Sequence, residues 1–325
     1  MKKILILLGF IGCNIAMAQN KNHVQSVLWK VVYAKTGATS YVLGTNHSLG
    51  NAWLNKFHFL VDIIASSDVM FTETASYKVA QQDMDGLNDG KPKTFIELFG
   101  RDSLLVDSFY NAYLGFPIGN IGASKNIVPN NSFEKQKLFL VAFNDLAITK
   151  FHVDLSNQYK LRADTFDITN IETLDGILEK TALKNKKPLF GLDDNVKVIK
   201  SFANVSLIST EIVSTIKDIV NYQNGVRSEH NDKRIKDLKL FYKGLMDFTV
   251  AYTTKLKDAD KASLLDRNKL WGDRLKEELK NKNAFIAVGA GHLFFRKKYG
   301  ILDVLKRSGY IVTPVNMIEA SKALN

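Results

Sequence analysis

Cysteine is almost absent from this 325-residue chain, in which Cys13 is the single example. A disulfide within the chain and a metal site made of several thiolates are therefore excluded. Cys13 also lies in a segment that we expect to be removed, and the remaining chain then has no cysteine nucleophile. The chemistry of any site must come from histidine, carboxylate, hydroxyl, amide or guanidinium groups.

Long apolar runs are also missing, except at the N-terminus. Two lysines precede the apolar residues 4–11, and the small residues of Ala16-Met-Ala18 come just before Gln19. This order is typical of a secretory signal peptide, and the run is too short to span a membrane. We expect residues 1–18 to be removed and the mature protein to be exported to the periplasm or the extracellular space, with no membrane span. The alternative is a lipoprotein, because Phe10-Ile-Gly-Cys13 resembles a lipidation box with Cys13 as the acylated residue.

The charge balance is basic, with 44 Lys and Arg against 33 Asp and Glu and a formal net charge of +11. A charge of this sign can indicate binding to nucleic acid, but here the lysines are scattered and no cluster of basic and aromatic residues occurs. We therefore expect no nucleic-acid partner. The chain has no internal repeat and no low-complexity linker, so residues 19–325 are expected to form one domain.

Two segments far apart in the sequence carry the same short pattern. Ala284–Val288 is a continuous apolar run, typical of a strand buried on both faces, and Gly289-Ala-Gly-His292 follows it directly. Near the N-terminus, the predicted strand Ser40–Leu43 is followed by Gly44-Thr-Asn-His47. Two predicted strands thus end in Gly-x-x-His, which places His47 and His292 at strand ends, where open α/β sheets bind ligands.

A third predicted strand, Val69–Thr72, ends in Glu73. Between this strand and His47, residues 52–66 have the apolar spacing of a helix with one buried face. A strand, a helix and a strand in this order predict two parallel strands in one sheet, so that His47 and Glu73 emerge from the same edge.

The rest of the chain alternates helices with a few short strands. Residues 27–33 are predicted to form a hairpin with the first Gly-x-x-His strand, and we expect a helical insertion at about 75–185 and a helical block at 207–282. The other predicted elements are strands at 187–192 and 310–315 and helices at 196–202 and 294–308. Asp193 or Asp194 is expected to cap the helix at 196–202. The fold class is mixed α/β, with a central, mostly parallel sheet, helices around it and the active site at the strand ends.

Asn268 breaks the apolar stripe of the predicted helix before the His292 strand. Leu264, Trp271 and Leu275 share its side of that helix, so Asn268 is expected to point inward. A buried amide needs hydrogen-bond partners. Asn268 is therefore either a structural anchor or part of the polar lining of a site.

Two neutral imidazoles and a carboxylate form a common ligand set for Zn²⁺, Mn²⁺, Co²⁺ or Fe²⁺, and such a site supports hydrolysis. His47, Glu73 and His292 are the candidate ligands, with Glu73 alternatively the general base. On spacing alone, both histidines could instead be satisfied core residues. The other four histidines lack the glycine turn and are interpreted as surface or packing residues. A dinucleotide-binding protein is disfavoured because Phe294 stands where Gly-x-Gly-x-x-Gly needs glycine, and a serine hydrolase because Gly-x-Ser-x-Gly is absent.

The motifs taken together resemble the TraB/PrgY/GumN family, whose animal members are the Tiki metalloproteases. The resemblance rests on Tyr41-Val-Leu-Gly-Thr-Asn-His47, on Glu73 with its strand, on Asp266-Arg-Asn268 and on Ala287-Val-Gly-Ala-Gly-His-Leu293. It implies a mixed α/β fold related to erythromycin-esterase and ChaN-like proteins. It also implies a peptidase that depends on Mn²⁺ or Co²⁺, with residues matching His47, Glu73 and His292 at the metal and Arg267 and Asn268 as further site residues.

The expected function is therefore an exported, metal-dependent hydrolase that acts on a peptide or protein, with Zn²⁺ as a further metal candidate. In this hypothesis His47, Glu73 and His292 bind the metal, and Arg267 and Asn268 polarise the substrate carbonyl. Two alternatives stay open. One is a non-catalytic protein that binds peptides, as pheromone-binding relatives do, and the other is a metal-independent hydrolase in which histidine is the base and glutamate orients it.

Overall fold

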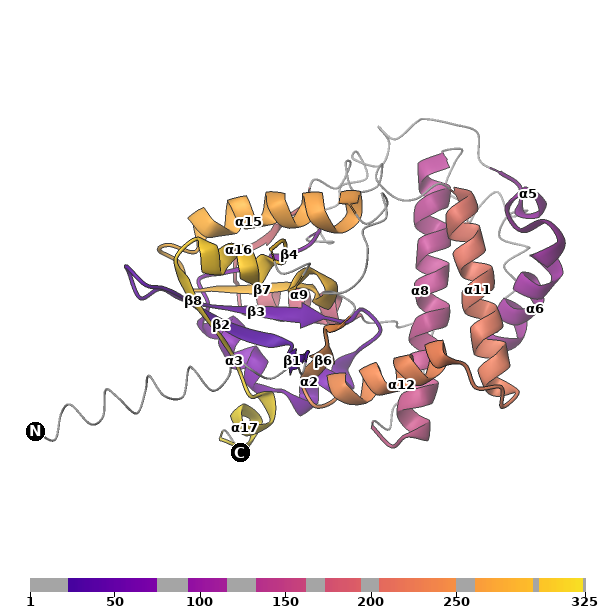
Figure 1. Ribbon diagram of the computed structural model, residues 1–325, viewed down its shortest axis with the longest axis horizontal. Helices are drawn as coiled ribbons and strands as arrows, with labels where there is room; N and C mark the ends of the chain where they lie inside the picture. Colours follow the sequence, from indigo (N-terminus) through magenta and orange to yellow (C-terminus); the bar gives the residue numbers. More distant parts are fainter. Residues whose placement is uncertain are drawn as a thin grey trace, which may run out of the picture.

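The computed structural model describes residues 23–74, 93–115, 133–161, 173–193, 205–249, 261–294 and 298–323. The predicted signal peptide with Cys13 and the predicted helix at 196–202 lie outside these ranges. The described residues form a mixed α/β structure with a central sheet surrounded by helices (Figure 1), so the predicted fold class is confirmed.

Six strands form the central sheet, in the order β5-β4-β7-β3-β2-β8. The four strands from β5 to β3 run parallel, whereas β2 is antiparallel to both of its neighbours. β7 lies between β4 and β3, and five of its six residues are buried, as its continuous apolar sequence predicts. The strands are β2 (Leu28–Tyr33), β3 (Thr39–Thr45), β4 (Val69–Thr72), β5 (Leu189–Gly191), β7 (Ala284–Gly289) and β8 (Tyr310–Pro314).

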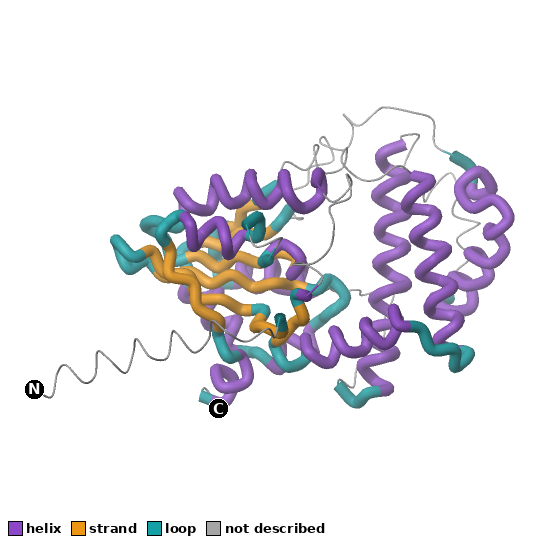
Figure 2. Tube along the Cα trace, viewed as in Figure 1, coloured by secondary structure: helices purple, strands orange, loops and turns teal. Residues whose placement is uncertain are grey.

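Alternate side chains of β7 enter two different hydrophobic cores. Phe285 and Ala287 belong to the core under α2 (Asn51–Lys56), α3 (Phe59–Ser66) and α9 (Leu174–Lys184). Ala284, Ile286 and Val288 belong to the core under α15 (Arg267–Glu278) and α16 (Ile301–Arg307). Helices thus cover both faces of the sheet (Figure 2), which explains why this strand has no polar side.

The helix predicted between β3 and β4 is two helices, α2 and α3, with a break at Phe57 and His58. Phe57 has φ −118° and ψ 48°, outside the helical region. In one continuous helix Phe57 and Phe59 would point to nearly opposite sides. The break allows both rings to be buried, with centroids 6.5 Å apart.

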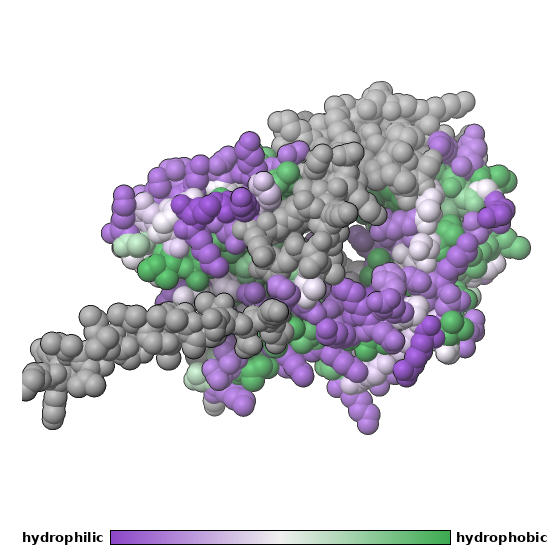
Figure 3. All heavy atoms as spheres, in the orientation of Figure 1, coloured by the Kyte–Doolittle hydropathy of each residue, from purple (hydrophilic) through white to green (hydrophobic). Residues whose placement is uncertain are grey.

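Four helices pack together beside the sheet, on the right in Figure 1. α8 and α11 lie side by side, α5 and α6 contact α11, and α12 runs from this group toward the sheet. Apolar side chains gather on the outer surface near α5 and α6 (Figure 3), where Ile96 and Leu104 are exposed. The bounds are α5 (Phe95–Phe99), α6 (Ser103–Leu114), α8 (Phe133–Gln158), α11 (Val205–Gln223) and α12 (Glu229–Phe241).

The prediction that residues 207–282 are helical is wrong at Leu245, which lies in a strand. Strand β6 (Leu245–Asp247) pairs antiparallel with β1 (Val24–Ser26) in a separate two-stranded sheet. A strand of three residues is too short for the alternation of apolar and polar residues to be recognised in the sequence. The last predicted helix, 294–308, is confirmed from Ile301 to Arg307, and it is not helical at Phe294 or at 298–300. Short elements complete the described chain: η2 (Gly100–Asp102), η4 (Lys261–Asp266), η5 (Ala290–His292) and α17 (Met317–Lys322).

Candidate functional site

Three neighbouring strands end at the same edge of the sheet. β3 and β4 both run parallel to β7, with Thr45 opposite Gly289 and Thr72 opposite Ala287. His47, Glu73 and His292 follow these strand ends by one to three residues. The structure therefore places the three candidate ligands beyond one edge, the edge at which parallel sheets bind ligands.

The first glycine of each Gly-x-x-His segment makes room for a close contact. A Cβ at Gly44 would lie 2.6 Å from Leu293 Cδ1, next to the turn that carries His292. A Cβ at Gly289 would lie 3.1 Å from Glu73 Oε1. Each glycine thus lets its strand approach another part of the site, which gives the repeated motif a structural reason.

Glu73 lies between the backbone of β7 and the side chain of Arg267. Its Oε1 accepts the Gly289 N–H at 2.6 Å, and its Oε2 accepts Arg267 Nη2–H at 2.5 Å. Burial alone would raise the pKa of this carboxyl group, but the charges of His292 and Arg267 and the Gly289 hydrogen bond hold the pKa below its usual value. Because His292 is itself neutral at pH 7, we take Arg267 as the main positive neighbour. Glu73 is therefore ionised.

His292 is buried, with a relative exposure of 5%, and burial lowers its pKa to about 4. Its Nδ1 lies 2.6 Å from Asn268 Oδ1, which can only accept, so Nδ1 carries the proton. Nε2 then carries the lone pair, which accepts Arg267 Nη1–H at 3.5 Å, and Glu73 Oε1 lies 3.8 Å away. The Trp271 ring packs against the imidazole with centroids 4.4 Å apart. His292 is thus a fixed, neutral side chain whose Nε2 faces the site.

Asn268 points inward, as its position on the helix predicts, and is fully buried. Its Oδ1 accepts from His292, whereas its Nδ2 has no hydrogen-bond partner among the residues described. The amide is fully buried and its oxygen orients His292 in this structure, which is the structural anchor that the sequence left open. Its expected role in polarising a carbonyl stays a prediction.

Asp193, for which the sequence favoured a helix cap, contacts the site through Arg267. Arg267 binds its carboxylate through two hydrogen bonds, Nε–H to Oδ1 at 3.1 Å and Nη2–H to Oδ2 at 2.6 Å. Trp271 Nε1–H also donates to Oδ1, at 2.7 Å, and only 1% of the side chain is exposed. This carboxylate is a buried partner of Arg267, whereas the predicted cap by Asp193 or Asp194 concerns a helix that lies outside the described residues. Its place after β5, at the same edge as Glu73, was the available signal.

His47 is held differently from His292. Its side chain is 56% exposed, and its Nδ1 lies 2.7 Å from Asp175 Oδ2. The other oxygen, Oδ1, accepts Thr45 Oγ1–H at 2.7 Å. The hydrogen bond to Asp175 raises the pKa of His47 to about 9, although burial acts in the opposite direction. Asp175 is a carboxylate that the sequence analysis did not identify as a site residue.

The three candidate ligands are not gathered as a finished metal site. Within the described ranges, no three His, Cys, Asp or Glu side chains are grouped so that they could hold an ion. The Arg267 guanidinium lies against both Glu73 and His292. The donor types nevertheless fit a divalent ion, because both histidines have Nδ1 bound to a side-chain oxygen, and an ion could take Nε2 of His292 in place of its contact with Arg267. Histidines that bind metals usually carry such a hydrogen bond on the second nitrogen.

The remaining histidines take no part in this edge. His58 and His230 are exposed, and His230 Nδ1 pairs with Asp218 at 2.5 Å. His152 lies on α8, where its Nδ1 is buried with no partner among the described residues and burial lowers its pKa to about 3.

In the described part of the chain, no helix is both long and apolar enough for a bilayer span.

Comparisons with known proteins place the chain in a family. No curated protein and no solved structure matches the sequence. The model of the TraB/PrgY/gumN family matches residues 27–314, which include all three strand ends and α15. The chain belongs to the TraB/PrgY/gumN family.

Proposed function

We propose that this protein is an exported, metal-dependent hydrolase that cleaves peptide bonds in a peptide or protein substrate. His292, His47 and Glu73 would hold a divalent ion, with Mn²⁺ or Co²⁺ preferred and Zn²⁺ as a further candidate. The observation that carries this proposal is the matched hydrogen bonding of the two imidazoles, each tied through Nδ1 to a side-chain oxygen. Such a bond fixes the ring and raises the basicity of Nε2, which is the atom left for a metal.

The side chains that surround this edge support hydrolysis. Glu73 is ionised and lies 3.8 Å from His292 Nε2, so it can bind a cation or accept a proton from water. A divalent ion bound there would polarise a carbonyl group and acidify water. Arg267 is 17% exposed and is fixed by Asp193. Its guanidinium is thus preorganised to donate to an oxygen on which negative charge develops.

The position of Arg267 also favours a second candidate, hydrolysis without metal. The guanidinium contacts Glu73 and approaches His292, the place where a cation would be held. In this alternative, His292 accepts a proton from water at Nε2 while Asn268 holds its ring through Nδ1. Glu73 lies 3.8 Å from Nε2, and Arg267 stabilises the oxyanion. His292 is neutral at pH 7 and therefore able to accept a proton. Metal dependence separates the two candidates.

The first experiment is elemental mass spectrometry on untagged protein, incubated with Mn²⁺, Co²⁺ or Zn²⁺ and desalted. We expect about one ion per chain in wild type and a loss of that ion in His292→Ala and His47→Ala. His230→Ala is the matched control for His47, because His230 is also 56% exposed and also bound to an aspartate through Nδ1, but lies on α12. Equal trace metal in all four proteins would exclude the metal-dependent function.

The second experiment tests hydrolysis with a peptide library analysed by mass spectrometry, with and without EDTA. Cleavage that EDTA abolishes and Mn²⁺ restores supports the proposal. Cleavage unaffected by EDTA supports the metal-free alternative. Binding of peptides without any cleavage would contradict both.

Export rests on residues 1–18 and is tested by the intact mass of protein recovered from the periplasm or the medium. We expect a chain that begins at Gln19. A chain that begins at an acylated Cys13 would indicate a lipoprotein, and an unprocessed cytoplasmic chain would contradict export.

A further inference from the structure

We propose that Asp175 is a positioning residue of this site, which holds Nδ1 of His47 and thereby directs Nε2 of His47 toward the edge shared with Glu73 and His292. The inference rests on the proposed function, because it assigns the support for one of the proposed ligands. His47 and Asp175 are 128 residues apart in sequence, and their side chains meet at 2.7 Å.

The two oxygens of Asp175 have one donor each. Thr45, the last residue of β3, donates to Oδ1, and Oδ2 remains for the imidazole two residues further along the chain. The carboxylate cannot rotate without losing both hydrogen bonds, and only 15% of its side chain is exposed. Asp175 thus contacts the strand end and the histidine that follows it, which fixes the direction of the imidazole relative to β3.

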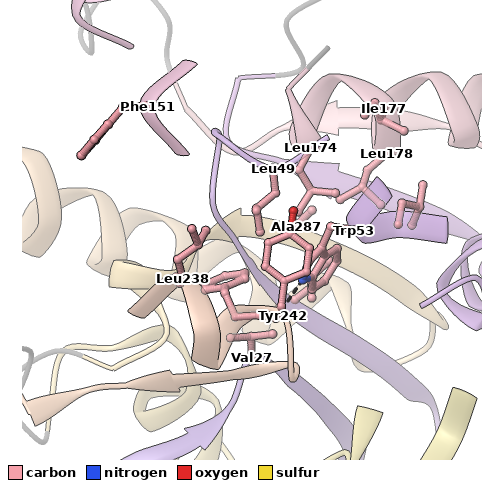
Figure 4. Close-up of a cluster of buried hydrophobic side chains, with 14 of the residues drawn as sticks. Val27, Leu49, Trp53, Phe151, Leu174, Ile177, Leu178, Leu238, Tyr242 and Ala287 are labelled. Atoms are coloured by element: carbon pink, nitrogen blue, oxygen red, sulfur yellow. Dashed lines mark hydrogen bonds between the residues drawn. The ribbon is translucent and has the colours of Figure 1, made fainter. Parts of the chain in front are cut away.

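The helix that carries Asp175 is itself anchored to the sheet. One turn further along α9, Glu179 is buried and accepts Thr72 Oγ1–H at 2.9 Å, from the last residue of β4. The buried face of α9 contributes Leu174, Ile177 and Leu178 to the core beside Leu49 and Trp53 (Figure 4). α9 therefore contacts the ends of both strands that flank β7. The helix that carries Asp175 is thus fixed to the sheet.

The orientation of the His47 ring depends on its hydrogen bond to Asp175 more than the orientation of the His292 ring depends on Asn268. His292 is buried, packs against Trp271 and binds Asn268. His47 is more than half exposed, and the bond to Asp175 is the one hydrogen bond of its ring among the described residues. Without Asp175 the imidazole would be free to change its side-chain rotamer. Metal binding would then have to order the side chain of His47, at a cost in conformational entropy.

The test measures Mn²⁺ affinity by titration calorimetry for wild type, Asp175→Ala and Asp175→Asn. Removal of a residue that supports a ligand typically weakens metal binding by about 10- to 100-fold, which is the loss we expect for Asp175→Ala. Asp175→Asn keeps one oxygen acceptor and should recover part of the affinity. Thr72→Val is the matched control, since it removes a hydrogen bond between α9 and the end of β4 and leaves Asp175 unchanged. We expect its affinity to stay close to that of wild type.

A second measurement is independent of metal and of activity. Protein labelled with ¹⁵N only in histidine should show the Nδ1–H signal of His47, assigned by its absence in His47→Ala. We expect this signal in wild type and Thr72→Val and its loss through exchange with water in Asp175→Ala. If wild type binds no metal, the proposed metal-dependent function fails, and the NMR comparison alone decides the role of Asp175. An unchanged His47 signal in Asp175→Ala, or an equal loss of affinity in Thr72→Val, would overturn the inference.

Discussion

The backbone N–H of Gly289 donates to Oε1 of Glu73 at 2.6 Å, so that one strand fixes the acidic side chain supplied by its neighbour. Gly289 is also the residue that begins the second Gly-x-x-His segment. The same glycine therefore starts the turn to His292 and positions Glu73, and the two proposed ligands are coupled through the backbone of β7.

Gly289→Ala should displace the Glu73 carboxylate. Its new Cβ would lie 3.1 Å from Oε1, closer than an ordinary contact, and would weaken the hydrogen bond from Gly289. A hydrogen bond to a charged group contributes about 1.5–3 kcal/mol, so we expect Mn²⁺ affinity to fall by about tenfold or more. Gly291→Ala is the control from the same motif, because its Cβ would meet no atom within 4 Å. Equal titration curves for both variants would contradict this coupling.

Arg267→Ala should destabilise the fold strongly at neutral pH. It leaves the buried carboxylates of Asp193 and Glu73 without their positive partner. Removal of one member of a buried ion pair typically costs about 3–5 kcal/mol, which urea unfolding at pH 7 would measure. Arg274→Ala is the control on the same helix, because Arg274 donates to the Gly191 carbonyl oxygen and lies over the Phe71 ring but pairs with no carboxylate among the described residues. A smaller loss in Arg267→Ala than in Arg274→Ala would refute the prediction.

The pH dependence of Arg267→Ala has a definite sign. In wild type, the pKa of Glu73 is held below its usual value, so its contribution to stability is present at neutral pH and is lost as the pH falls. Without Arg267 the folded state should bind protons on Glu73 and Asp193 more readily than the unfolded state does. We therefore expect the difference in unfolding free energy between wild type and Arg267→Ala to shrink from pH 7 to pH 4.

Asn268→Ala should affect both stability and the candidate site. The substitution leaves the buried Nδ1–H of His292 without its acceptor, which typically costs about 1–3 kcal/mol. Mn²⁺ affinity should fall as well, because the imidazole loses its orienting bond. Asn231→Ala is the control, since Asn231 is equally buried and donates to the Asp218 carbonyl oxygen, on α11. It should lose stability and retain metal binding, and equal metal loss in both variants would point to a general effect of destabilisation.

His152 should make the protein sensitive to acid. Burial lowers its pKa to about 3, and the nearby charge of Arg234 acts in the same direction. Unfolding restores a pKa near 6.5, so the unfolded state binds a proton between these pH values and the folded state does not. Stability contributed by the neutral form is complete above about pH 6.5 and decreases as the pH falls toward about 3. We expect His152→Leu to unfold with a flatter pH dependence than wild type, and His58→Ala, at an exposed position, to match wild type.

The sequence predicts the strand ends well because their signals are local. The apolar run of β7, the hairpin of β2 and β3 and the glycine that precedes each histidine can each be recognised within one short segment, 18 residues from Leu28 to Thr45 in the case of the hairpin. Asp175 and Asp193 could not be identified in the same way. An aspartate near the start of a helix has the same local pattern whether it caps the helix or binds a distant side chain. Their partners, His47 and Arg267, lie 128 and 74 residues away in the sequence.

The predicted boundaries of helices and strands are wrong where tertiary packing determines them. The break at Phe57 depends on burying two aromatic rings, and β6 exists only because β1 pairs with it. Neither signal is contained in the local spacing of apolar residues. The inward direction of Asn268 was predictable, but its bond to His292 was not, since it depends on how α15 packs over the end of β7.

The central position of β7 has a consequence for the order in which the chain can fold. β3 and β4 flank this strand, yet their partner residues in β7 lie more than 200 positions later in the sequence. A nascent chain therefore holds two of the three strand ends long before the strand between them has been synthesised. Pairings over such distances form slowly because a long loop must close first. The sheet, and with it the edge that carries His47, Glu73 and His292, can close only when nearly the whole chain is available, so we expect C-terminal truncations that remove β7 to abolish folding and not merely the site.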